Sequence, residues 1–184
     1  MTRYILFIFI LLPTLAQATY NPMFAPNTRN SIGIYGAQST GPGDLGHLVA
    51  PWEWRFLPMT TIMLQYSQPI QILRLPSRVN IHALQNLSYH GQSGTSFAAI
   101  GISWDILLMA YHGFYLGVGI GPYMRDSSDD YVASRLVFGE RVFIGKNITP
   151  KFRTEFFTLH FSNGDFTEPN HGFNFAGIGF NFSF

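Results

Sequence analysis

The last segment of the chain, Phe173 to Phe184, carries apolar side chains at every second position. Because successive side chains of a β-strand point to opposite faces, this alternation predicts a strand with one apolar face. That face holds Asn174, Ala176, Ile178, Phe180, Phe182 and Phe184. The other face holds Phe175, Gly177, Gly179, Asn181 and Ser183. The wall of an outer-membrane barrel typically has an apolar face toward lipid. In a narrow barrel, its other face carries mostly small side chains toward the lumen.

The composition favours the same class of protein. Only 11% of the residues are charged, against about 25% in an average globular protein, whereas 16% are aromatic. After the first 18 residues, no apolar run approaches the roughly 20 residues that a transmembrane helix needs. Helices and closed barrels are the only structures that span a bilayer, so a barrel is predicted. A soluble secreted β-sandwich is the alternative.

Eight segments have strand character and are separated by clusters of turn residues. They are Ser31 to Gln38, Thr60 to Gln68, Val79 to Leu87, Ser96 to Leu108, Phe114 to Arg125, Ala133 to Gly145, Lys151 to Asn163 and Phe173 to Phe184. We therefore predict an all-β fold, an eight-stranded antiparallel transmembrane β-barrel whose lumen is filled by side chains. The region Ser39 to Pro58 holds a Gly/Pro loop and then the sequence APWEWRFLP, which is either a short strand or an interfacial aromatic segment.

The N-terminus has the features of a secretory signal peptide over residues 1–18. Arg3 provides the positive charge, Tyr4 to Leu12 the apolar core, and Ala16-Gln17-Ala18 the cleavage site. Cleavage leaves residues 19–184 as a single barrel domain. We expect this domain in the bacterial outer membrane.

Charge and cysteine content exclude several classes of function. Once Arg3 is removed with the signal peptide, ten basic residues balance ten acidic ones, so nothing indicates nucleic-acid binding. The chain has no cysteine, which excludes disulfides, thiolate metal sites and a cysteine nucleophile. The histidines lack a metal-ligand spacing such as H-E-x-x-H, and we predict no metal and no cofactor.

His160 and Ser162 lie two residues apart in the seventh segment, so a strand places both on one face. The alternate face carries Arg153 and Glu155. Charges that face lipid cost a few kcal/mol at mid-depth, so these two belong in the lumen and His160 and Ser162 face outward. Asn174 has the outward parity of the following strand. Antiparallel pairing of the two strands brings it within reach of His160.

The segment from Phe138 onward resembles the lipid A 3-O-deacylases, the PagL-type barrels. The resemblance rests on the sequences HFSNG at 160–164 and PNHG at 169–172, which precede the terminal strand. It includes Phe138 followed by Glu140 and Arg141, one strand upstream. The combination H-x-S-N…P-N-x-G is far more specific than an isolated His or Ser. Before this segment the match is limited to general character.

The resemblance implies a serine hydrolase whose site lies on the outside of the barrel and cuts the ester-linked 3-hydroxyacyl chain at position 3 of lipid A. Ser162 is then the nucleophile and His160 the base that takes its proton. The candidate oxyanion donors are Asn163, Asn170 and the backbone around Gly164. Phe138 helps to form the acyl-binding surface. The implied partners are lipopolysaccharide and membrane lipids, and a homodimer is possible.

One residue departs from the family pattern. Asn174 stands where the best-known members carry the Glu of the triad. An amide can orient the imidazole but cannot stabilise the imidazolium by charge. Glu140, which also has outward parity, is the rival acid, and Glu168 in the last loop is a weaker third choice.

Two other functions stay open at this point. A non-catalytic small barrel with a structural or binding role would explain the substitution at position 174. An esterase or phospholipase that acts on another membrane lipid would use the same residues on a different ester.

Overall fold

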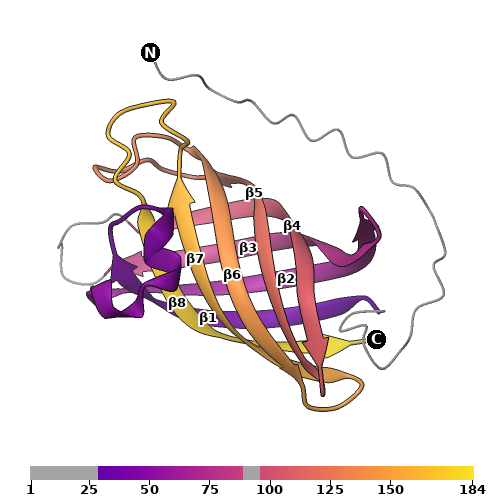
Figure 1. Ribbon diagram of the computed structural model, residues 1–184. Coiled ribbons are helices and arrows are strands. Elements are labelled where there is room, and N and C mark those ends of the chain that lie inside the picture. The colour runs from indigo at the N-terminus through magenta and orange to yellow at the C-terminus, as the bar shows by residue number, and fades with distance from the viewer. Residues whose placement is uncertain (1–28, 89–95) are drawn as a thin grey trace.

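The computed structural model describes residues 29–88 and 96–184, which form one closed barrel of antiparallel strands (Figure 1). The strands are β1 (Ser31–Gly41), β2 (Met59–Ile72), β3 (Leu75–Ser88), β4 (Phe97–Tyr111), β5 (Phe114–Arg125), β6 (Leu136–Asn147), β7 (Phe152–Ser162) and β8 (Phe173–Ser183). Each strand pairs with its neighbours in sequence, and β8 closes the barrel against β1. The predicted fold class is confirmed.

Each of the eight predicted segments overlaps one strand, and several strands extend beyond the predicted bounds. The predicted signal peptide, residues 1–18, lies outside the described residues. Within the described residues, no helix has the length and apolar character needed to cross a bilayer.

The two faces of the wall follow the predicted parity. In β8, Ile178, Phe180 and Phe182 point outward and are about half exposed, whereas Phe175 and Asn181 are buried in the lumen. The other strands carry the same outward apolar belt. Its members include Ile34, Leu64, Ile81, Ile100, Ile120, Ile144 and Phe156. Such a belt is the surface that a barrel presents to lipid.

Buried ion pairs fill the middle of the lumen. Glu155 accepts hydrogen bonds from Arg78 Nη1 at 2.6 Å and from the Tyr35 and Tyr115 hydroxyls at 2.7 Å each. Arg78 Nε also donates to Asp105 Oδ2 at 2.6 Å. Arginines 141 and 153 complete the cluster. The prediction that Arg153 and Glu155 lie in the lumen is confirmed.

The two ends of the barrel differ in their connections. Short turns at 73–74, 112–113 and 148–151 lie at one end, and the longer connections between strands lie at the other. Because outer-membrane barrels have short periplasmic turns and longer extracellular loops, the second end faces the cell exterior.

The connection between β1 and β2 forms two 3-10 turns, η1 (Leu45–Val49) and η2 (Pro51–Glu53). The alternative of a short strand in this region is therefore wrong. Asp44 begins η1, because its side chain accepts a hydrogen bond from the Gly46 N–H at 2.9 Å. Figure 1 shows the turns against the outside of the wall beside β7 and β8, and η1 contacts β6, β7 and β8.

Candidate active site on the outer wall

One row of residues crosses four strands near the extracellular end. Glu140 of β6 pairs with His160 of β7, His160 pairs with Asn174 of β8, and Asn174 pairs with Gly41 of β1. Directly paired residues on one face of an antiparallel sheet have Cβ atoms about 4.5–5.5 Å apart. The register therefore brings both candidate partners of the imidazole, Glu140 and Asn174, next to His160, one on each side.

Among the described residues, the hydrogen-bond partner of the imidazole is Asn174. His160 Nδ1 lies 3.0 Å from Asn174 Oδ1. The amide oxygen of Asn174 can only accept, so Nδ1 carries the proton and donates it. Nε2 is then the basic nitrogen of the ring.

Ser162 lies beyond His160 on the same outward face and is half-buried. It pairs with Phe138 of β6, whose ring centroid lies 6.2 Å from that of Phe166. The two rings form an apolar surface next to the serine. Among the hydrogen bonds of the described residues, none joins Ser162 to His160.

The two asparagines of the last loop bond within the loop. The Asn163 side chain donates to the carbonyl and hydroxyl oxygens of Thr167, both at 2.7 Å. Asn170 Nδ2 donates to Asp165 Oδ1 at 2.7 Å, and its Oδ1 accepts from the Asn163 N–H at 3.0 Å. The donors of both amides are thus engaged in holding the loop beside Ser162.

Gly172 approaches the site more closely than any other residue type permits. A Cβ at this position would lie 2.5 Å from His160 Cε1 and 2.7 Å from the carbonyl oxygen of Gly43. The backbone φ of Gly172 is +66°, which also favours glycine. The glycine of the PNHG sequence therefore lets the loop pass directly over the imidazole.

A second element covers the site. His160 is only 5% exposed and Asn174 only 1%, whereas Ile178, on the same face of β8 farther down the wall, is 52% exposed. The difference follows from the η1 segment, which packs over the wall at this level. Strand parity predicts that His160 faces outward but does not predict the segment that covers it.

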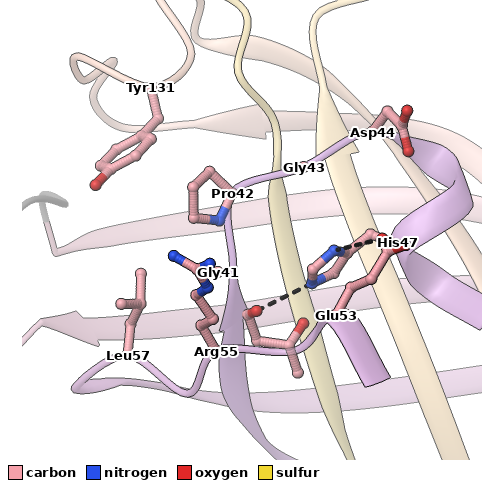
Figure 2. Close-up of a pocket in the computed structure, with 10 residues that line it drawn as sticks. Gly41, Pro42, Gly43, Asp44, His47, Glu53, Arg55, Leu57 and Tyr131 are labelled. Atoms are coloured by element: carbon pink, nitrogen blue, oxygen red, sulfur yellow. Dashed lines mark hydrogen bonds and ion pairs between the residues drawn. The ribbon is translucent and has the colours of Figure 1, made fainter. Parts of the chain in front are cut away.

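A cavity of about 590 Å³ lies behind this segment at the barrel mouth (Figure 2). Gly41 and Gly43 line it, and both accept hydrogen bonds from Asn174. Its ionisable lining comprises Asp44, His47, Glu53, Arg55 and Tyr131. An anion site is lined by predominantly positive charge, whereas here two carboxylates outnumber the one guanidinium.

Glu140 differs from the lumen carboxylates in its surroundings. Its Oε2 is buried and has no hydrogen-bond partner. Buried polar atoms without partners are uncommon in proteins and are concentrated at functional positions. Glu168, the third candidate acid, is exposed in the last loop.

Within the described residues, no group of three or more His, Asp or Glu side chains is arranged to hold a metal ion. The groups gathered at the site are an imidazole, a hydroxyl, an amide and a carboxylate. These are the side chains of acyl transfer by a serine nucleophile.

A comparison with known protein families identifies the family of the chain. The model of the family described as lipid A 3-O-deacylase (PagL) matches residues 51–183. The chain belongs to the lipid A 3-O-deacylase (PagL) family. Membership makes it a hydrolase of the bacterial outer membrane and confirms the resemblance seen from Phe138 onward.

Solved structures resemble the barrel at low sequence identity. The crystal structure of the outer-membrane enzyme PagL superposes with a TM-score of 0.60 at 12% identity, covering 84% of this chain and 99% of that one. Neisserial surface protein A gives a TM-score of 0.55 at 13% identity, covering 84% and 97%. At such identities the similarity shows the fold alone. No curated protein sequence matches the chain.

Proposed function

We propose that Ser162, His160 and Asn174 carry out the lipid A 3-O-deacylation to which family membership assigns this chain. The observation that carries the proposal is the hydrogen bond from His160 Nδ1 to Asn174, since it fixes the tautomer whose Nε2 can accept the proton of Ser162. The catalytic bond from Ser162 to Nε2 then forms when substrate binds, as such bonds often tighten only in the complex.

The reaction runs in two balanced steps. Ser162 Oγ attacks the ester carbonyl carbon while its proton passes to His160 Nε2, and the tetrahedral intermediate collapses to an acyl-serine. The sugar O3 leaves with the proton from Nε2. Water, deprotonated by His160, then attacks the acyl-serine and releases the 3-hydroxy fatty acid and free Ser162.

The oxyanion of the intermediate needs hydrogen-bond donors. The backbone N–H of Gly164, two residues after Ser162, has no hydrogen bond among those of the described residues, whereas the intervening N–H of Asn163 donates to Asn170 Oδ1. Asn163 and Asn170 keep the positioning role, because their amides hold the loop that presents this N–H.

Asn174 and Glu140 together take the two roles of a triad acid, which are to orient the imidazole and to stabilise the imidazolium. Asn174 orients the imidazole by accepting from Nδ1 but carries no charge. Glu140, the cross-strand neighbour of His160, supplies a carboxylate in the low-dielectric wall and stabilises the imidazolium without a hydrogen bond.

The substrate approaches from the membrane. Phe138 and Phe166 lie beside Ser162 at the end of the lipid-facing belt, so an acyl chain already in the outer leaflet can lie along the wall against them. Its ester then meets Ser162 at the depth where acyl chain and headgroup join. The lipid therefore does not have to leave the membrane to reach Ser162.

The test is mass spectrometry of lipid A from cells that express the chain, beside cells that express Ser162→Ala. The expected result is loss of one 3-hydroxyacyl mass with the wild type and unchanged lipid A with the variant. Deacylation by the variant would overturn the serine mechanism.

Unchanged lipid A with a folded wild-type barrel would overturn the assignment to this substrate. Assays of the same membranes for free fatty acid from phospholipid then distinguish an esterase on another lipid from a non-catalytic barrel.

Export and assembly also belong to the proposal. We expect cleavage after Ala18, which N-terminal sequencing of the mature protein tests. The resemblance leaves a homodimer open, and cross-linking in native membranes tests it.

A further inference from the structure

Asn174 uses both ends of its side-chain amide. Its Oδ1 accepts from His160 Nδ1, and its Nδ2 donates to the carbonyl oxygens of Gly43 at 3.1 Å and Gly41 at 3.4 Å. A carboxylate in the same place could accept from His160 but would meet two carbonyl oxygens with no proton to donate. The amide is therefore the group that fits this position.

The Gly41 carbonyl ends β1, and the Gly43 carbonyl lies at the start of the β1–β2 connection, of which we call residues 42–57 the cover segment. Gly43 N–H also donates to the His171 carbonyl at 3.1 Å, so the segment is tied to the last loop as well. Inside it, His47 Nε2 lies 3.0 Å from the Thr40 carbonyl and Trp54 Nε1 donates to the His47 carbonyl at 2.9 Å. These bonds give the cover segment a defined shape.

The cover segment exposes four large apolar side chains beside the charged side chains of Asp44, Glu53 and Arg55. Leu45, Val49, Trp52 and Phe56 are all exposed, and Trp52 is 80% exposed. The segment packs on the same strands that carry the lipid-facing belt, so its apolar side chains continue that belt toward the headgroups. Tryptophan and other large apolar side chains at this level of a membrane protein are seated in the interface.

We propose that the cover segment is a bilayer-seated part of the active site and that Asn174 is the positioning residue that fastens it to His160. The proposal rests on the function proposed above for His160. Contact of the segment with lipid holds the carbonyls of Gly41 and Gly43 in place, these hold Asn174, and Asn174 holds the imidazole. The asparagine that departs from the family pattern is thus matched to the segment above it.

The first experiment tests the seating of the cover segment and needs no activity. The purified barrel is placed in phosphatidylcholine vesicles with brominated acyl chains, and tryptophan quenching is compared between wild type and Trp52→Phe. Trp104 on the lipid-facing wall is also open to quenching, but it is present in both proteins. The difference between them therefore reports Trp52. A quenched Trp52 component is expected. An unquenched component, with emission typical of water, would overturn the seating.

The second experiment tests the fastening by Asn174→Glu, which restores the carboxylate of the family. The expected result is a fall in kcat of at least tenfold, together with weaker quenching of Trp52 and an unchanged unfolding temperature of the barrel. Asn147→Glu, the same change at the far end of β6, is the matched control. It is expected to leave kcat, quenching and unfolding unaltered.

A kcat of Asn174→Glu equal to or above that of the wild type would overturn the fastening role. So would unchanged Trp52 quenching in this variant, because a purely catalytic asparagine would leave the segment in place. If the wild type itself fails to deacylate lipid A, the proposed function fails, and the two quenching measurements still decide the seating and the fastening.

Discussion

Two glutamates on neighbouring strands of the barrel, Glu155 and Glu140, have opposite surroundings. Glu155 faces the lumen and accepts hydrogen bonds from Arg78, Tyr35 and Tyr115. Glu140 faces outward beside His160 and has a buried oxygen without a partner. Removal of one partner from a buried ion network is strongly destabilising, whereas a buried charge without a partner itself lowers stability and is retained for another reason. The lumen therefore holds the barrel together, and the outer wall carries the chemistry.

The largest effect is expected from a substitution that removes the catalytic base on the outer wall and leaves the lumen unchanged. His160→Gln should lower kcat by about 10⁴-fold, equivalent to about 5.5 kcal/mol of transition-state stabilisation, because no other base lies beside Ser162. Single-turnover assays on lipid A in mixed micelles measure the loss. The free energy of unfolding in urea should stay within about 1 kcal/mol of the wild type. A large loss of stability would mean that the outer row also holds the barrel.

The converse change removes the centre of the lumen network. Glu155→Ala leaves the three buried arginines of the cluster against one carboxylate, Asp105, and should lower the free energy of unfolding by about 3–5 kcal/mol. Urea titration of the refolded barrel measures it. Glu168→Ala, at an exposed glutamate of the last loop, should change stability by no more than about 0.5 kcal/mol. Equal stabilities of the two variants would contradict the structural role of the lumen.

Gly172→Ala tests how closely the last loop must approach the imidazole. The added Cβ displaces His160, and the strained backbone costs about 1–3 kcal/mol. We expect a fall in kcat of roughly 100-fold from the misplaced ring. Gly113→Ala, in the short turn at the far end of the barrel, is the matched control, since Gly113 also has a positive φ, +80°, but its Cβ would meet no atom closer than 3.3 Å. A similar loss in both variants would assign the effect to backbone strain alone.

The smallest effect is expected from Glu140→Gln, which keeps the shape and removes the charge. The loss of electrostatic support for the imidazolium should lower kcat roughly tenfold, about 1.4 kcal/mol, with KM unchanged. Steady-state kinetics beside Glu168→Gln measures it. The variant should be as stable as the wild type or more so, because a buried charge without a partner is removed. An unchanged kcat would leave Asn174 as the sole partner of His160.

Much of this protein follows from the sequence because strand alternation is a local property. The side chains of Phe173 to Phe184 reveal one lipid-facing and one lumen face without knowledge of any neighbour. The same parity predicts that Arg153 and Glu155 face inward and that His160 and Ser162 face outward, as observed. The number of strands and their approximate bounds follow from the turn residues between them.

Other features depend on how remote segments meet, and the tertiary structure alone decides them. Register across four strands sets Glu140, His160, Asn174 and Gly41 in one row, and barrel closure of β8 on β1 brings Gly41 to Asn174. The cover segment has neither helical nor strand periodicity, so its position over His160 depends on the carbonyls of Gly41 and Gly43 reaching the amide of Asn174. Alternation along one strand determines which way a side chain faces, whereas pairing between distant strands determines what it meets there.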